Sequence, residues 1–311
     1  MKNYRYLEES TALRNIAIRS AFSNSVAVNM PLSQWHGIAY SRELNMLLAV
    51  PLTHGAGELG NFSVDGGISW SNCNMPDDFW FSVTWSPELG IFCAVGGAVA
   101  TTPNGTTWSF TSHSHALLSV AWSPELGIFC AVGDTIGTSS DGTSWTFANP
   151  PQANTWTSIA WSPELGMFAA GAADGTHRIM TSPDGTSWSL VEIPGGTWRG
   201  MEWSPELGIF CAVADSGSHR VLTSRNGRLW EAIQVPSNEW SSVTWSPELG
   251  VFCAVAREGP DNIMLSFDGF DWRAYNFGIA ANEWYDIAWA SQEGRFCAVA
   301  YDGTNRVVVS G

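Results

Sequence analysis

Residues 85–95 read WSPELGIFCAV, and nearly the same letters return four times further along the chain. With two weaker copies there are seven in 311 residues, and the other six begin at Tyr40, Trp122, Trp161, Trp203, Trp245 and Trp289. A supersecondary unit repeated at about 40 residues buries its apolar faces only against its neighbours. The sequence therefore predicts a repeat architecture that fills most of the chain.

The fourth copy, residues 156–197, shows how one unit is built. Residues 157–162 are rich in β-formers and lead through the turn PELG into the apolar run 167–171. Residues 178–182 predict a third strand, and a fourth begins at Thr186 after a tight turn. Four antiparallel strands per unit around an axis are typical of a β-propeller. The predicted fold is all-β, a seven-bladed β-propeller of four-stranded antiparallel blades.

The last position of the PELG turn is glycine in six copies and Asn45 in the first copy. Glycine adopts positive φ freely, and asparagine tolerates that left-handed conformation better than other residues do. We therefore expect a left-handed backbone at this position in all seven copies.

A second motif marks the turn between the third and fourth strands. Residues 63–70 read SVDGGISW, which resembles the Asp box, the Ser-x-Asp-x-Gly-x-Thr-Trp motif of sialidase-like (BNR) propellers. Five further turns resemble it in shortened form, and the six key positions are Asp65, Asn104, Asp141, Asp184, Asn226 and Asp268. The resemblance implies a propeller in which these turns are structural and lie away from the active site. An Asp or Asn here accepts hydrogen bonds from its own turn, which also indicates a structural role.

The tryptophans and cysteines follow the repeat. All 18 tryptophans occupy three repeat positions: before the first strand, at its end, and after the Asp box. We expect them to pack between neighbouring sheets. Five of the six cysteines share one position inside the apolar run, too far apart for disulfides, so we interpret them as small buried residues in reduced form.

The seventh copy stops after its third strand. Residues 25–31 resemble the fourth-strand segment 188–194, so we expect the N-terminal region to supply the missing strand and close the ring. Residues 1–24 then form an arm, which either packs along the outer edge of the last blade or docks a partner. The predicted propeller spans residues 25–311, with 25–34 as closing strand and blades at about 35–79, 80–116, 117–155, 156–197, 198–239, 240–283 and 284–311.

Charge and composition exclude several classes of protein. The net charge is −15, from 29 acidic against 14 basic residues, which argues against binding to a nucleic-acid backbone. The sequence predicts no secretion signal and no membrane insertion, and so a location in a virion or in the cytoplasm. His113 and His115 form half of a possible metal site or, as an alternative, an ordinary loop pair. Without a third ligand, metal spacing or a phosphate-binding glycine motif, we predict no metal and no cofactor.

The variable loops are the candidate binding region. If the first strands line the axis, the PELG turns and Asp boxes share one face, while the loops between second and third strands and between blades share the other. The repeats differ most on that second face, and variable loops on a rigid scaffold carry binding residues. Three copies have a related polar loop there, and with a nearby tryptophan the candidate ligand-binding residues are Asp174, His177, Arg178, Trp198, Asp215, His219, Arg220, Asp302, Asn305 and Arg306. They either bind a sugar or simply brace hairpins.

Catalysis is the less favoured hypothesis. A glycosidase needs two carboxyl groups at a defined separation, and the candidates near the axis or where blades begin are Glu202, Asp286, Glu239 and Glu283. A sialidase would also need an arginine cluster and a tyrosine nucleophile. Arg199 and Tyr285 are the only such residues where blades begin, and they lie in non-adjacent copies. We therefore predict no catalytic residues.

The sequence favours a rigid, non-catalytic propeller that acts as an interaction or structural module. Its near-identical repeats resemble propeller proteins encoded by phages and large DNA viruses of aquatic microbes, in which such modules serve as particle components or host-surface binders. The predicted partners are a protein in a larger assembly or a cell-surface glycan. A free glycan-binding lectin and a sialidase-like glycoside hydrolase are the alternatives.

Overall fold

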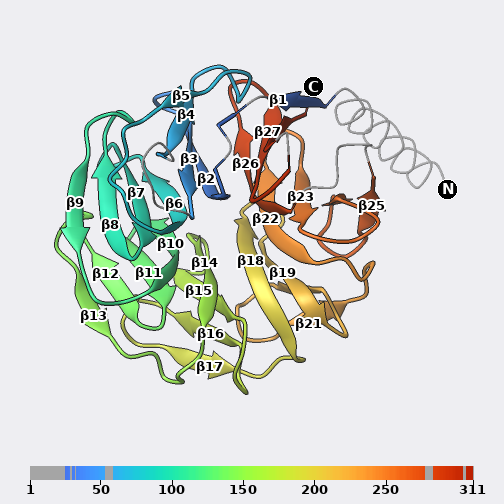
Figure 1. The fold of residues 1–311 in the computed structure, drawn as a ribbon. Helices are drawn as coiled ribbons and strands as arrows, with labels where there is room; N and C mark the ends of the chain where they lie inside the picture. The colour runs from blue at the N-terminus through green and yellow to red at the C-terminus, as the bar shows by residue number, and fades with distance from the viewer. Residues whose placement is uncertain are drawn as a thin grey trace.

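The computed structural model describes residues 25–28, 30–31, 33–52, 59–276, 283–303 and 306–310. They form seven four-stranded antiparallel sheets around a common axis (Figure 1). These residues contain strands and turns only, without a helix. The predicted seven-bladed propeller of four-stranded blades is confirmed, whereas the predicted arm, residues 1–24, lies outside the described residues.

The strands of each blade run outward from the axis. The innermost, first strands of blades 1 to 7 are β2 (Trp35–Ser41), β6 (Trp80–Ser86), β10 (Leu117–Ser123), β14 (Trp156–Ser162), β18 (Gly196–Ser204), β22 (Trp240–Ser246) and β26 (Trp284–Ala290). The second strands are β3 (Met46–Pro51), β7 (Ile91–Gly96), β11 (Ile128–Gly133), β15 (Met167–Ala172), β19 (Ile209–Gly217), β23 (Val251–Ala256) and β27 (Arg295–Ala300).

The outer half of each blade is shorter. The third strands are β4 (Asn61–Ser63), β8 (Ala98–Thr102), β12 (Ile136–Ser139), β16 (Ile179–Ser182), β20 (Val221–Ser224), β24 (Ile263–Ser266) and β28 (Val307–Val309). The outermost strands are β5 (Ser71–Asn72), β9 (Ser109–Ser112), β13 (Thr146–Ala148), β17 (Ser189–Val191), β21 (Glu231–Ile233), β25 (Arg273–Tyr275) and, in blade 7, β1 (Val26–Val28).

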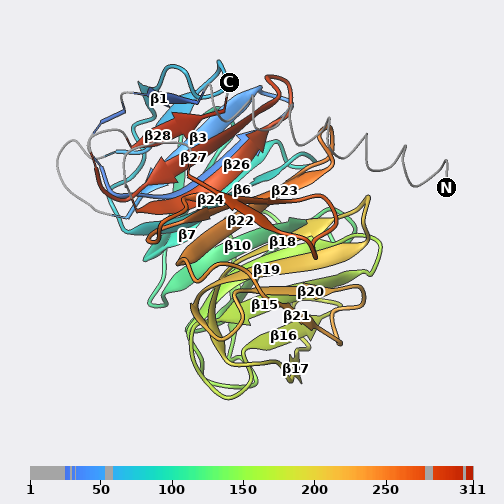
Figure 2. The same ribbon diagram turned by 90° about the vertical axis from the view of Figure 1, so that its right-hand side faces the viewer.

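The ring closes through β1, as the sequence predicts. β1 pairs antiparallel with β28, in the register Val26 with Val309 and Val28 with Val307. Figure 2 shows β1 lying beside β28 at the edge of blade 7. The side chains of Val28 and Met30 are buried in the cluster that also contains residues of β2 and β27. The two ends of the described chain therefore share one sheet.

The turn after the third strand differs slightly from expectation. The fourth strand of blade 4 begins at Ser189, three residues after the predicted start at Thr186. The backbone N–H groups of Thr186 and Ser187 donate to Asp184 Oδ1, at 2.7 and 2.6 Å. These amides are therefore engaged in the turn rather than in the β-ladder, which delays the strand.

The equivalent Asp and Asn positions of the other turns that resemble the Asp box make the same kind of bond. Asp141 Oδ1 accepts the N–H groups of Thr143 and Ser144, both at 2.7 Å. These backbone donors hold the pKa of Asp141 well below its usual range. The six aspartate and asparagine side chains thus serve their own turns, as the sequence indicates.

The left-handed position of the PELG turn is present in every blade. Asn45 has φ 47°, and the matching glycines include Gly166 at 59° and Gly90 at 63°. A Cβ added at Gly166 would meet nothing within 4 Å. The backbone conformation, rather than a lack of space, therefore favours glycine there.

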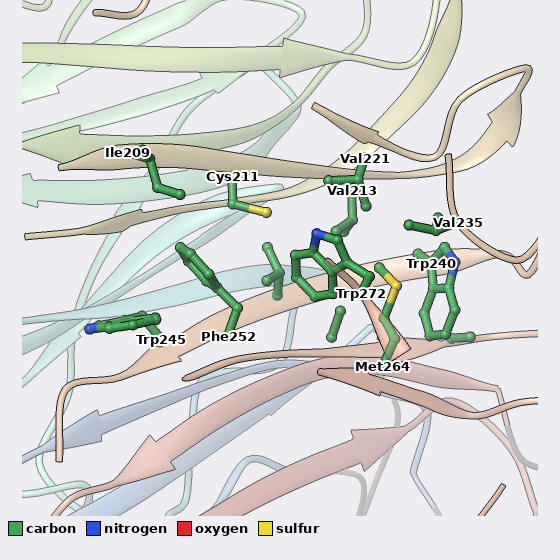
Figure 3. Packing of buried hydrophobic residues seen from close by; sticks show 13 residues of the cluster. Ile209, Cys211, Val213, Val221, Val235, Trp240, Trp245, Phe252, Met264 and Trp272 are labelled. Carbon is green, nitrogen blue, oxygen red and sulfur yellow. The ribbon is translucent and has the colours of Figure 1, made fainter. Parts of the chain in front are cut away.

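The apolar core lies between the blades. In one cluster, Trp240 and Phe252 of blade 6 pack with Val213 and Val221 of blade 5 (Figure 3). The six cysteines are free and buried. Burial raises the pKa of Cys73 to about 12. Each interface between sheets therefore carries its own hydrophobic cluster, with tryptophan as its largest member.

The PELG glutamate also joins neighbouring blades. Glu125 of blade 3 accepts a hydrogen bond from the indole Nε1 of Trp161 in blade 4, at 2.6 Å. The same bond, at 2.6 to 2.7 Å, joins five other pairs: Glu43 and Trp85, Glu88 and Trp122, Glu164 and Trp203, Glu206 and Trp245, and Glu248 and Trp289. We call these six bonds the Trp–Glu ring. The sequence predicts the motif only as a turn, so this second role is a finding of the structure.

The interface between blades 7 and 1 uses different residues. Tyr40 replaces the tryptophan, and Gln292 replaces the glutamate. Tyr40 Oη accepts the backbone N–H of Gln292 at 3.3 Å, and Gln292 Nε2 donates to the carbonyl of Arg42 at 2.7 Å. Asn45 Nδ2 also donates to Glu293 Oε1 at 2.6 Å. The closing interface is therefore chemically distinct from the other six.

Candidate functional site

A cavity of about 980 Å³ follows the propeller axis. Residues of all seven first strands line it, and it extends to the PELG turns at Pro124, Pro163 and Pro247. Figure 1 shows the first strands, such as β14 and β18, surrounding the centre of the ring. We call this cavity the axial channel.

The side chains at one repeat position line the end of the channel that lies away from the PELG turns. In blade 4, Trp156 pairs with Ala172 and Ser158 pairs with Gly171, which leaves Thr157 as the extra residue of a β-bulge. The equivalent shift occurs in every blade, and it turns the extra side chain toward the axis. The seven side chains are His36, Phe81, Leu118, Thr157, Arg199, Ser241 and Tyr285, and all line the cavity. We call this ring the channel mouth.

The channel mouth has an apolar side and a polar side. Phe81 and Leu118, from blades 2 and 3, are half-buried and line the cavity together with Leu52. The second and third strands of blade 2 are joined by Gly97 alone, so this blade has no long loop at the mouth. Blades 5 to 7 contribute the charged groups.

A charged network spans three blades on the polar side. Asp215 Oδ2 accepts from Arg199 Nε at 2.7 Å and from Arg257 Nη2 at 2.9 Å. Arg257 also pairs with Glu239 at 3.1 Å and donates to Tyr285 Oη at 3.1 Å. Its guanidinium lies 5.3 Å from the centre of the Tyr285 ring. Arg199 and Tyr285, which the sequence places in non-adjacent copies, thus belong to one network through Arg257.

His36 adds a neutral aromatic ring to the mouth. Its Nδ1 lies 2.7 Å from the carbonyl oxygen of Phe81, so Nδ1 carries the proton. The pKa of His36 is lowered to about 4, chiefly by burial and to a smaller extent by the charges of Arg199 and Arg257. The imidazole is therefore neutral at pH 7, with Nε2 as a hydrogen-bond acceptor. Its ring centre lies 4.6 Å from that of Tyr285.

Two carboxyl groups lie deeper in the channel. Asp286 accepts from Ile38 N at 2.9 Å and from Ser242 Oγ at 2.6 Å, which ties blade 7 to both neighbours. Glu202 Oε1 accepts from Trp203 N at 3.0 Å, while no described residue donates to its Oε2. Burial raises the pKa of Asp286 to about 6 and that of Glu202 to about 7, and the charge of Asp286 adds to the second shift. Both groups keep partial contact with the lumen.

The raised pKa of Glu202 predicts that Glu202→Gln increases the stability of the protein at high pH but not at low pH. Its folded pKa of about 7 exceeds the ordinary value of 4.5, so its contribution to stability is complete below pH 4.5 and is lost as the pH rises through 7. We expect the variant to match wild type near pH 4 and to be more stable at pH 8 by about 1–2 kcal/mol. Urea unfolding at both pH values measures this. An equal or lower stability at pH 8 would contradict it.

The arginines of the predicted polar loops brace the backbone. Each guanidinium bonds to carbonyls of its own loop and to one carbonyl at or just before the start of the first strand of the following blade. The pairs are Arg178 with Gly196, Arg220 with Asn238, and Arg306 with Ser33. These bonds match the bracing hypothesis, and the sugar-binding hypothesis for these loops stays a prediction.

The three aspartates of the predicted polar loops make different contacts. Asp174 accepts the N–H of Thr155 at 2.7 Å, and Asp302 accepts the N–H of Glu283 at 2.8 Å, so both hold the chain ahead of a first strand. Asp215 instead bridges the two arginines of the mouth. The sequence identified Asp215 but gave no signal that it would meet Arg257.

The remaining predicted residues are dispersed. Trp198 is completely buried, with 0% exposure. His177 Nε2 lies 2.8 Å from Glu192 Oε1, and His219 Nδ1 lies 3.1 Å from Ser218 Oγ. Asn305 lies outside the described residues.

The histidine pair of blade 2 shows no metal site, and no membrane-spanning helix occurs in the described residues. The rings of His113 and His115 stack 6.3 Å apart. Within the described ranges, no group of three or more His, Cys, Asp or Glu side chains is arranged to hold a metal ion. None of the described segments forms a helix long and apolar enough to span a bilayer.

Comparison with known proteins identifies the fold. No family model matches the sequence. No curated protein matches it either. A streptogramin B lyase structure is similar with a TM-score of 0.77 and 11% identity, covering 92% of this chain and 97% of that one. A catalytically inactive virginiamycin B lyase from Staphylococcus aureus, solved with quinupristin, has a TM-score of 0.76 and 11% identity, covering 92% and 98%.

A third similar structure is YCF48 from Cyanidioschyzon merolae, with a TM-score of 0.68 and 15% identity over 92% of this chain and 98% of that one. At such low identity these similarities concern architecture and carry no activity from one protein to another. They agree with the strand order described above, and the chain is a seven-bladed β-propeller.

Proposed function

We propose that the protein is a non-catalytic binding module whose site is the channel mouth. The observation that carries this proposal is the variety at one repeat position. The residue before it is tryptophan in six of seven copies, yet the position itself holds seven different residues. The same bulge forms around every one of them, so the backbone does not require this variety. A binding site accounts for this variety, because binding residues gather at variable positions on a rigid scaffold.

The size and chemistry of the channel support binding. Its volume of about 980 Å³ is at the upper end for sites that enclose a small molecule or a side chain. Both oxygens of Asp286 already accept protein hydrogen bonds. Glu202 and Asp286 therefore do not form a pair of free carboxyl groups of the kind that glycoside hydrolysis uses. A module of this kind serves as the recognition part of a larger assembly, a virus particle being one setting.

Blocking the mouth provides the test. In Leu118→Trp, an indole replaces a half-buried side chain that faces the cavity. We expect at least a tenfold loss of whatever binding the wild type shows on peptide and glycan arrays, because the larger ring fills the opening. Leu229→Trp is the matched control, since Leu229 is 77% exposed on an Asp-box turn and lies outside the cavity. Binding that survives Leu118→Trp but not Leu229→Trp would place the site elsewhere.

A further inference from the structure

The interior of the axial channel is acidic. Between the mouth and the tryptophans at the ends of the first strands, Glu202 and Asp286 are the only charged residues of the described first strands. Above them, Arg199 and Arg257 are paired with Asp215 and Glu239. Two guanidinium groups therefore face four carboxyl groups.

The rim beside Arg257 adds to this negative charge. Burial is the main cause that raises the pKa of Glu283. The negative charges of Asp302, Glu258 and Glu239 also raise this pKa, in that order, so these carboxylates lie near Glu283. Charges of one sign that line a cleft with low-dielectric walls attract the opposite charge. The carboxyl groups of the rim and of the channel interior therefore favour a cationic ligand, whereas the guanidinium groups of Arg199 and Arg257 oppose a positive charge right beside His36.

The uncharged lining suits a cation on an apolar stem. Phe81, Tyr285 and the neutral ring of His36 present aromatic surfaces at the mouth, where a cation is attracted to ring faces. The next level contains Ile, Val and Met side chains that are mostly buried between the blades, together with serine and threonine hydroxyls of the same strands, which include Ser82, Ser158 and Thr244. Lysine and arginine side chains combine such a stem with a charged head.

We propose that the group bound in the channel is an ammonium or guanidinium on a flexible apolar stem, and that its charged head pairs with Glu202 Oε2. This proposal rests on the proposed function and specifies its ligand. Glu202 is suited to the role because its carboxyl is enclosed by protein while Oε2 has no donor among the described residues. Asp286, whose oxygens are occupied, adds charge from nearby.

Calorimetry with defined probes tests the proposal. The probes are a short capped glycine–serine peptide with a central arginine, the same peptide with citrulline, and agmatine, a small molecule with a guanidinium at one end and an ammonium at the other. Citrulline keeps the shape of arginine but lacks its charge. At pH 8 we expect the arginine peptide to bind at least tenfold more tightly than the citrulline peptide. Equal binding of agmatine shows that a small cation without a peptide backbone is sufficient, whereas binding of the peptide alone identifies a peptide ligand, and either supports the proposal.

Two variants locate the binding energy. Glu202→Gln should weaken the arginine peptide at least tenfold, because it removes the charge and preserves the shape. Glu231→Gln, at an exposed position outside the channel, should leave the affinity unchanged. If Glu202→Gln binds like wild type, if citrulline matches arginine, or if no cationic probe binds, the proposal is overturned. Array binding that Leu118→Trp abolishes would still uphold the proposed function in any of these cases.

The pH dependence gives a separate readout. A cation prefers the ionised carboxyl, so affinity in the wild type should rise between pH 6 and pH 8. The titratable groups facing Glu202 are Asp286 across the channel and Cys211, its partner on β19. Burial keeps the pKa of the Cys211 thiol well above this range, so it stays protonated. In Glu202→Gln the rise should become much smaller, and an unchanged rise would contradict the assignment to Glu202.

Discussion

Removing residues 1–34 is expected to leave the protein insoluble or unfolded. The deletion takes away β1 and exposes the full edge of β28 to solvent, where an unpaired strand invites association with other chains. It also removes Val28 and Met30 from the cluster around Trp35. The carbonyl of Ser33, to which Arg306 donates, is lost as well. Circular dichroism and size-exclusion chromatography of the expressed protein measure the outcome.

The matched control removes residues 1–24 only and retains β1. It is expected to be soluble, to keep the β-sheet spectrum and to unfold cooperatively. A well-folded monomer from the longer deletion would show that blade 7 is stable with three strands and that β1 is dispensable.

Trp198→Ala is expected to destabilise the protein by about 3–5 kcal/mol, because it leaves a large cavity between blades 4 and 5. Trp198 has 0% exposure and packs with Phe210 and Leu222. A loss of sugar binding in this variant would therefore report unfolding rather than a lost ligand contact. Chemical denaturation followed by far-ultraviolet circular dichroism measures the change. A loss below about 1 kcal/mol would contradict the packing role.

Phenylalanine substitutions separate packing from hydrogen bonding at this position. The indole nitrogen of Trp198 is buried and has no hydrogen-bond partner, whereas that of Trp156 donates to the carbonyl of Gln152 at 3.3 Å. Trp198→Phe should therefore cost less stability than Trp156→Phe, because only the second removes a hydrogen bond. The reverse order would indicate that the nitrogen of Trp198 has a partner in solution.

The fold follows from the sequence because its signals are local and repeated. The PELG turn, the Asp-box-like turn and the apolar run between them each predict one piece of backbone, and the seven copies of the PELG turn and apolar run indicate the number of blades. The closing strand was also predictable, because residues 25–31 carry the pattern that blade 7 lacks. Only the start of the fourth strand was placed too early, because the Asp-box aspartate engages the amides of Thr186 and Ser187.

The candidate site was only partly predictable. Arg199, Tyr285, Glu202 and Asp286 stand out in the sequence as departures from the repeat. Arg257 does not, because it lies after a second strand, in a loop without a constant length. The bulge that turns one side chain per blade toward the axis has no sequence signature either, since residues as different as Phe81 and Thr157 occupy it. Contacts across blades depend on three-dimensional register, which residue type does not encode.

The Trp–Glu ring affects how the first and last blades come to pair when the propeller closes. Six interfaces with the same tryptophan and glutamate contact give a nascent blade several chemically equivalent neighbours, within its own chain and in other chains. Repeat proteins are prone to such exchange. The contact of Tyr40 with Gln292, and of Asn45 with Glu293, occurs at one interface only. Because this interface is chemically unlike the other six, we expect the first and last blades to pair with each other in preference to the other blades, which favours closure at seven blades within one molecule.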